Sequence, residues 1–158
     1  MRRLFPALVI TPLAMLVCIA LVHAAATYND TASGAQTASP ESEGSALNLN
    51  ATGDLPGMLN IKLQHGSGSV TGGTWTMTVL PQNADANSSA TGTLTGTVSG
   101  GTIALDANGI ISAVNSVQLT VQSGTGQYEQ VTSGNGTLSL SADPENSTKL
   151  GGPLVLNF

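Results

Sequence analysis

Residues 46–158 contain short runs in which apolar and polar residues alternate, and this period of two constrains the fold more than any other feature of the chain. Alternate side chains of a β-strand point to opposite faces of the sheet, so such a run predicts a strand with one buried face. The clearest run, LNIKLQ, covers residues 59–64. The pattern therefore predicts an all-β fold.

Eight alternating runs occur between residues 46 and 158, and short polar or glycine-rich links separate most of them. Short links favour an antiparallel meander, and eight strands can close into a barrel, which leaves no exposed edge. A two-sheet β-sandwich is the alternative. The apolar members of the runs are Leu47 and Leu49; Leu59, Ile61 and Leu63; Trp75, Met77 and Val79; Leu94 and Val98; Ile103 and Leu105; Val117, Leu119 and Val121; Leu138 and Leu140; and Leu154, Leu156 and Phe158.

Two of the links contain glycine pairs or asparagine–glycine pairs that predict tight turns. Gly100 and Gly101 lie between two runs and predict a tight turn there. Asn108 and Gly109 form the dipeptide that is typical of a type I′ hairpin, in which both central residues take a positive φ.

The first 26 residues have the composition of an export signal. Arg2 and Arg3 precede an apolar stretch over residues 4–22, and small residues follow at Ala24 and Ala26. This order predicts a signal peptide over 1–26, cleaved after Ala24 or Ala26. The apolar stretch is close to the length that spans a bilayer, so an uncleaved membrane anchor is the alternative. In either case we expect a secreted, periplasmic or cell-envelope protein.

Residues 27–45 are mostly small and polar. Such a segment buries too little apolar surface to offset the entropy lost on ordering, so we expect a flexible polar linker. The predicted organisation is therefore a signal peptide over 1–26, a linker over 27–45 and a β-barrel domain over 46–158.

Charge and composition exclude several classes of function. Removal of the signal leaves Lys62 and Lys149 against nine acidic residues, a formal net charge of −7. Such a chain has no phosphate-binding surface, so we expect no nucleic-acid partner, and membrane contact only through an uncleaved N-terminal segment. Cys18 is the single cysteine and lies in the signal, and His65 is the single histidine of the mature chain. We therefore expect no metal site, no cofactor and no catalytic motif.

Small residues on one strand suggest a cavity inside the barrel. Gly92 and Gly96 share a strand face with Leu94 and Val98, so an apolar ligand has room if this face points inward. The alternative is that the glycines admit a bulky neighbour such as Trp75. The candidate ligand-binding residues of the barrel interior are Trp75, Met77, Leu94, Gly96, Leu119 and Tyr128.

Threonines alternate along two of the predicted strands. One group is Thr74, Thr76 and Thr78, and the other runs from Thr91 to Thr97 at every second residue. Two such groups on one surface would form an array of hydroxyl and methyl groups that orders water or ice. Threonine is also a common outward residue of ordinary strands.

Residues 117–140, VQLTVQSGTGQYEQVTSGNGTLSL, resemble the G-T-G-x-[YF]-x-x-x-x-G phrase of allene oxide cyclase and dirigent-like barrels. The resemblance covers mainly residues 73–142 and implies an eight-stranded antiparallel barrel. Tyr128 matches the aromatic residue that plugs one barrel end, and Gly124, Gly126 and Gly136 match the turn glycines. The cyclases' polar pocket and the dirigent proteins' arginine-lined cavity have no counterpart, so only the fold carries over. The chain also resembles small exported bacterial proteins with this phrase.

We therefore expect an exported, non-enzymatic barrel with a binding or structural role at the cell envelope or outside the cell. Its partner would be a small apolar ligand, or further copies in a homo-oligomer. The alternative is an isomerase-like or cyclase-like barrel enzyme acting on a small apolar substrate. An inward polar cluster, involving Glu129 or Asn115, would favour the enzyme.

Overall fold

The computed structural model describes residues 25–36, 44–66, 68–85 and 88–158. This part of the chain forms nine strands and one short 3₁₀ turn. Among the described residues, no helix is long and apolar enough to span a bilayer. The elements are β1 (Thr27–Gln36), β2 (Gly44–Gly53), β3 (Gly57–His65), β4 (Val70–Val79), β5 (Gly92–Ser99), β6 (Thr102–Leu105), β7 (Ile111–Gly124), η1 (Gly126–Tyr128), β8 (Gly134–Ala142) and β9 (Lys149–Asn157).

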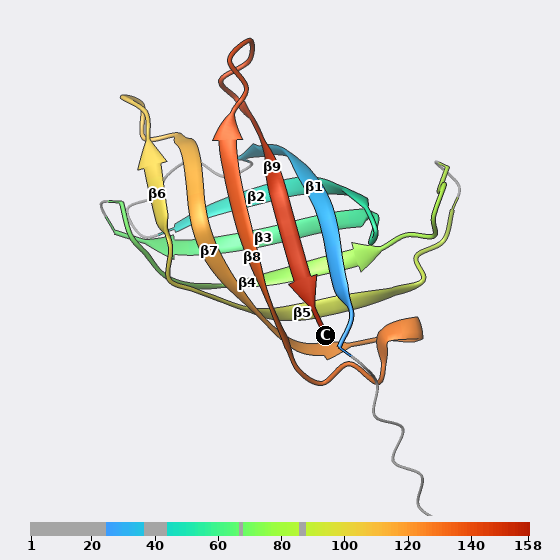
Figure 1. The fold of residues 1–158 in the computed structure, drawn as a ribbon. Helices are drawn as coiled ribbons and strands as arrows, with labels where there is room; N and C mark the ends of the chain where they lie inside the picture. Colours follow the sequence, from blue (N-terminus) through green and yellow to red (C-terminus); the bar gives the residue numbers. More distant parts are fainter. Residues whose placement is uncertain (1–24, 37–43, 67, 86–87) are drawn as a thin grey trace, which may run out of the picture.

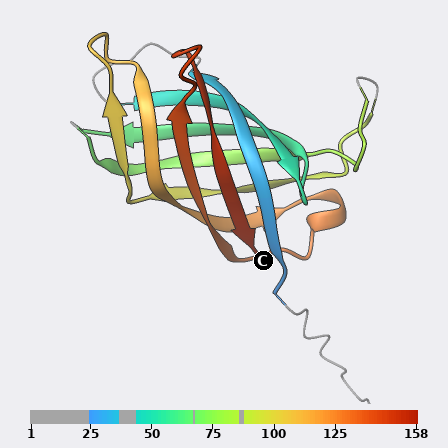
Figure 2. The same ribbon diagram turned by 45° about the horizontal axis from the view of Figure 1, so that its top comes forward.

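The strands form one antiparallel sheet that closes on itself (Figures 1 and 2). The first strand, β1, pairs with both β2 and β9, and β5 pairs with β7. Because β5 and β6 both pair with β7, they share one position in the ring, and the barrel has eight strands. The predicted all-β fold and closed antiparallel barrel are confirmed, and the sandwich alternative is not what forms.

The barrel has two ends, which we name by a residue at each. The Gln36 end holds the links β1–β2, β3–β4, β6–β7 and β8–β9, because strands in a meander run alternately up and down. The Phe158 end holds the links β2–β3, β4–β5 and β7–β8, together with η1.

The linker predicted over residues 27–45 is wrong where the structure describes it. Thr27–Gln36 is strand β1, and residues 44–45 begin β2, whereas residues 37–43 lie outside the described residues. The inward positions of β1 include Asp30 and Ala32, which give no apolar alternation. Backbone pairing to β2 and β9 forms this strand instead, so the barrel domain begins near Thr27.

Both predicted tight turns differ from what the structure contains. Gly100 and Gly101 have φ of 62° and 89° and form a bend, after which the chain stays paired with β7 as β6. In the β6–β7 link Gly109 has a positive φ of 77° but Asn108 does not, so this is no type I′ turn. Asp106 organises the loop instead, because its Oδ1 accepts the N–H groups of Asn108 and Ile110, each at 2.8 Å.

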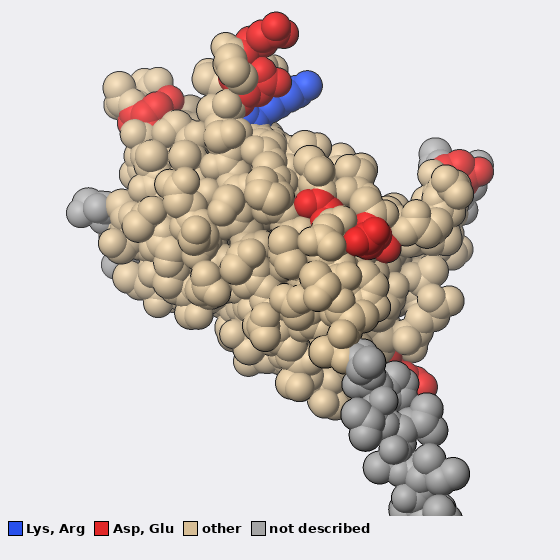
Figure 3. All heavy atoms as spheres, viewed as in Figure 1, with Lys and Arg blue, Asp and Glu red and all other residues tan. Residues whose placement is uncertain are grey.

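Charge is concentrated in the loops at the two ends of the barrel. In the described strands the charged residues are Asp30, which is buried, and the exposed Lys62 and Lys149. Figure 3 shows red carboxylates on projecting loops, further red groups on the body of the barrel, and a broad uncharged surface over the rest of this face. The described loop carboxylates are Asp106, Asp143 and Glu145 at the Gln36 end, and Asp54, Asp85 and Glu129 at the Phe158 end.

The predicted signal peptide lies almost wholly outside the described residues, but the start of the barrel bears on where it is cleaved. The Ala26 N–H donates to the Phe158 carbonyl at 2.9 Å, and the Phe158 N–H donates to the Ala26 carbonyl at 3.1 Å. Cleavage after Ala24 retains this pair, whereas cleavage after Ala26 removes it. We therefore expect the exported chain to begin at Ala25. Intact-mass measurement of the secreted protein checks this, and a chain beginning at Thr27 or Met1 would contradict it.

Candidate functional site

The predicted ligand-binding positions of the interior are filled by their own side chains. Trp75, Met77, Leu94 and Leu119 are each no more than 2 % exposed, and they belong to one cluster of buried apolar residues. The largest fully buried side chains are Trp75, Leu47, Leu59, Ile61, Leu63, Met77, Leu94, Ile111, Leu119, Leu138, Leu154 and Leu156. These residues come from strands all around the ring, so they pack against one another across the barrel axis.

Gly96 makes room for Trp75 rather than for a ligand. A Cβ at Gly96 would lie 2.7 Å from the Trp75 Nε1 and 1.8 Å from the Thr120 carbonyl oxygen. The indole N–H donates to that same carbonyl, at 3.3 Å. Of the two sequence interpretations, the structure favours the one in which glycine admits a bulky neighbour. The Trp75 ring therefore occupies the space that a ligand would need at this position.

Tyr128, the sixth predicted residue, lies at the Phe158 end rather than in the middle of the barrel. The Phe158 ring contacts Tyr128 edge-on at a centroid distance of 6.2 Å and stacks on Tyr28 at 4.7 Å. Burial raises the pKa of the Tyr128 phenol, although its hydrogen bond with the Thr91 side chain acts in the opposite direction. No sequence pattern indicated that Tyr28 joins this cluster, because Tyr28 lies in the predicted linker.

A surface pocket of about 400 Å³ lies beside these three rings. Its other lining residues are mostly exposed and uncharged, with amide and hydroxyl groups that can hydrogen-bond. The pocket is lined by Ala26, Tyr28, Gln127, Tyr128, Gln130, Val131, Thr132, Ser133 and Phe158. The three rings are partly buried and pack against the apolar core at this end of the barrel.

At the opposite end, three polar side chains form a buried hydrogen-bonded chain across the barrel mouth. The Ile111 N–H donates to the Gln36 Oε1 at 2.9 Å, and the Gln36 Nε2 approaches the Ser45 Oγ at 3.5 Å. The Ser45 Oγ lies 2.9 Å from the His65 Nε2, while the His65 Nδ1 lies 3.2 Å from the Gly66 carbonyl oxygen. If the proton is on Nδ1, this N–H donates to the Gly66 carbonyl and Nε2 accepts the hydrogen bond from the Ser45 hydroxyl.

The Ser45–His65 contact has the form of a nucleophile beside a general base, which sequence spacing did not reveal. However, Ser45 is 4 % exposed and His65 is 9 % exposed. The adjacent pocket, of about 420 Å³, is lined by Gln64, His65, Gly66 and Thr71 and does not reach Ser45. Ser45 is thus not among the described residues that line this pocket, and the burial of both side chains supports a structural network.

Asp30 is the one buried carboxyl group of the described strands. It is 6 % exposed, and its Oδ1 accepts the Leu55 N–H at 2.9 Å, whereas its Oδ2 is buried and has no hydrogen-bond partner in the described part of the chain. Burial raises the pKa of Asp30, the Leu55 hydrogen bond opposes this rise, and the charge of Asp54 adds to it. Within the described ranges, no three His, Asp or Glu side chains come close enough together to hold a metal ion.

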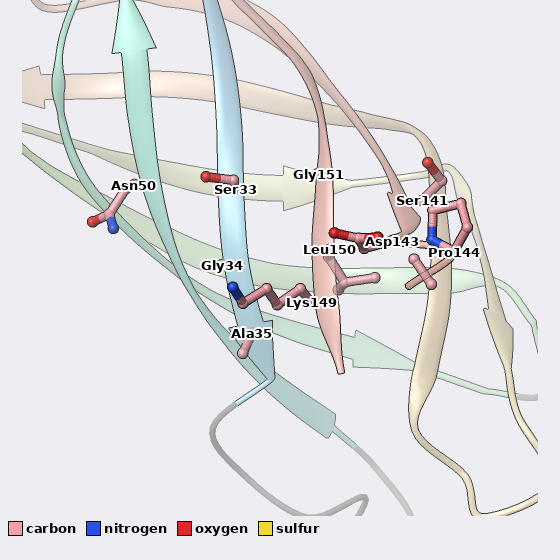
Figure 4. A pocket seen from close by; sticks show the side chains of 11 residues that line it. Ser33, Gly34, Ala35, Asn50, Ser141, Asp143, Pro144, Lys149, Leu150 and Gly151 are labelled. Carbon is pink, nitrogen blue, oxygen red and sulfur yellow. The ribbon is translucent and has the colours of Figure 1, made fainter. Parts of the chain in front are cut away.

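A shallow groove of about 540 Å³ crosses the outer wall beside the β8–β9 link. Figure 4 shows Lys149 reaching from β9 over the small residues of β1, with Asp143 and Pro144 on the other flank. Its remaining lining residues are small, or bear hydroxyl or amide groups. They are Ser33, Gly34, Ala35, Asn50, Ser141, Ala142 and Gly151, and the buried Leu150 is the exception.

The polar residues named for the enzyme alternative do not face the interior. Glu129 and Asn115 are both exposed to solvent. Comparison of the chain with protein-family models gives no match, and neither curated proteins nor solved structures give one. The geometry of the barrel is therefore the basis for a functional proposal.

The fit between Gly96 and Trp75 predicts a large effect of a small substitution. We expect Gly96→Ala to lower the free energy of unfolding by about 3 kcal/mol, because the new methyl group meets a backbone carbonyl that cannot move without breaking a strand pair. Urea unfolding followed by Trp75 fluorescence measures this. Gly66→Ala is the control, because a Cβ there meets nothing within 4 Å. Equal stabilities of the two variants would show that the interior has space for a methyl group at Gly96.

The buried carboxyl group predicts an unusual pH dependence. Because the pKa of Asp30 is raised in the folded state, its ionisation opposes folding as the pH rises above the ordinary value of 3.8. We expect Asp30→Asn to stabilise the barrel at pH 7, and this gain to disappear by about pH 3, where the carboxyl is protonated in both states.

Asp106→Asn is the matched control, with the opposite sign. Hydrogen bonds from the Ile110 and Asn108 N–H groups lower the pKa of Asp106, so its carboxylate stabilises the fold above the unfolded pKa and ceases to do so as the pH falls. Urea unfolding of both variants at pH 3 and pH 7 tests the pair. A loss of stability in Asp30→Asn at pH 7 would mean that the buried charge is favourable where it lies.

Proposed function

We propose that this chain is an exported, non-catalytic β-barrel of the cell envelope or the extracellular space, and that it binds its partners with its outer surface. The filled interior carries this proposal. Trp75, Met77, Leu94 and Leu119 occupy the space in which a small apolar ligand would lie, and Gly96 serves to admit Trp75. A barrel of this kind is a rigid scaffold that presents its wall and loops.

The outer wall has the chemistry of a surface for neutral partners. Its outward side chains are predominantly threonine, serine, asparagine and glutamine, which donate and accept hydrogen bonds without charge. Apart from the buried Asp30, the described carboxylates lie on the loops at either end, where they favour solubility and repel anionic surfaces. This distribution supports binding of uncharged, hydroxyl-rich or hydrated surfaces rather than of nucleic acid.

A barrel enzyme acting on a small apolar substrate is the second candidate, and the Ser45–His65 hydrogen bond is the observation that favours it. The burial of both side chains and the exposed positions of Glu129 and Asn115 argue against it. The resemblance to allene oxide cyclase and dirigent-like barrels enters this proposal at the level of the fold, supported by the position of Tyr128 at one barrel end.

Native mass spectrometry of the full exported chain tests the filled interior. We expect the mass of the polypeptide alone, with no lipid or other apolar molecule bound. Trp75→Ala is the positive control, because it removes a side chain that is 2 % exposed and should create a cavity that takes up benzene. If that variant fails to fold, Leu119→Ala replaces it. An apolar ligand released from the wild-type chain would overturn the proposal.

A further inference from the structure

Six threonines form a regular array on the outer wall. The register places Thr74 opposite Thr97, Thr76 opposite Thr95 and Thr78 opposite Thr93, so β4 and β5 present three successive threonine pairs. The residues between them, including Trp75 and Met77, point inward and are buried. Thr74 and Thr76 are exposed, and the other four are partly exposed. We call these six residues the threonine array.

The array is held in place by its strands and by hydroxyl contacts to the neighbouring segment. The Thr93 Oγ1 lies 2.7 Å from the Thr125 Oγ1, and the Thr95 Oγ1 lies 2.9 Å from the Ser123 Oγ. Threonine is also stiff at χ1, because it is branched at Cβ. The side chains of Thr93 and Thr95 are therefore held before any partner arrives, so ordering them on binding costs little side-chain entropy.

The chemistry of the array argues against most other partners. None of its six residues lines any of the three pockets described above, so it offers no concave site for a small ligand. It contains no aromatic, arginine or methionine side chain, which protein interfaces use as anchors. It also carries no charge, although Lys62 borders it opposite Thr74. A partner must instead offer a surface of regularly spaced hydrogen-bonding groups.

Ice presents such a surface. Neighbouring strands lie about 4.8 Å apart, and alternate residues of one strand lie about 6.6 Å apart, so the array repeats in two directions. Oxygen atoms on a face of ice also repeat at regular intervals in two directions, and each one donates and accepts hydrogen bonds as a threonine hydroxyl does. The methyl groups between the hydroxyls order the water that joins the two surfaces.

We propose that the threonine array of β4 and β5 binds ice, through ordered water held by its hydroxyl and methyl groups. The inference names a partner for the outer wall and rests on the role proposed for that wall above. Failure of the proposed function and failure of ice binding can be told apart. A ligand found inside the barrel would refute the role of the wall, whereas the freezing behaviour tests the threonine array alone.

The experiment measures thermal hysteresis and incorporation into a growing ice hemisphere, with the full exported chain. We expect a freezing gap and incorporation for the wild type, and the loss of both in Thr76→Tyr, which places a bulky ring at the centre of the array. Thr31→Tyr is the matched control, because Thr31 is exposed on β1, on the opposite side of the ring, and this variant should keep both activities. Trp75 is the single tryptophan and lies beside residue 76, so its emission reports whether each variant is folded.

If Thr76→Tyr disrupts the fold, Thr74→Tyr takes its place, at the exposed edge of the array. A wild-type chain with no hysteresis and no incorporation into ice would overturn the proposal. Retained activity in a folded Thr76→Tyr variant would overturn it as well. Retention of the wild type on crystalline cellulose, together with exclusion from ice, would assign the wall to a polysaccharide instead.

Discussion

The barrel depends on the backbone ladder that β1 makes with both of its neighbours. Its inward positions include Asp30 and Ala32, so it contributes much less apolar burial than β3, whose inward residues are Leu59, Ile61 and Leu63. Pairing with β2 and β9 forms it nonetheless. Without β1 those two strands would become exposed edges, which are sites of aggregation. The strand with the weakest sequence pattern is thus the one that completes the hydrogen bonding of the whole sheet.

Closure also explains how the interior is organised. Side chains from strands around the ring meet on the axis, and large residues must lie opposite small ones for them to fit. Trp75 against Gly96 is the clearest case, because the indole lies where a side chain at residue 96 would be and its N–H bonds to the Thr120 carbonyl. Polar groups are confined to the mouths of the barrel, where Ser45 and His65 satisfy one another at one end and three aromatic rings close the other.

Local patterns in the sequence predicted the features that depend on residues close together in the chain. The alternation in β3, β4 and β7 was sufficient to predict strands and their buried faces, and the short links favoured an antiparallel meander. The choice between a closed barrel and a sandwich stayed open until the pairing of β1 with β9 and of β5 with β7 was known. The eight predicted strands correspond to β2 to β9 and omit β1, and the barrel nonetheless has eight positions because β5 and β6 share one. The bend at Gly100 and Gly101, the burial of Asp30 and the meeting of Ser45 with His65 depend on pairing between distant segments, for which a single sequence carries no local pattern. The sequence contained the two groups of threonines, but only the pairing of β4 with β5 shows that they lie opposite one another.

The confinement of carboxylates to the two ends of the barrel makes the molecule electrically anisotropic. Two copies that approach end to end bring like charges together, whereas two copies that approach wall to wall meet across nearly neutral surfaces. Salt screens the repulsion between the charged ends and has little effect on the contact between the nearly neutral walls. In concentrated solution, the relative orientation of neighbouring molecules should therefore depend on ionic strength, even though the fold itself contains few charges that salt could affect.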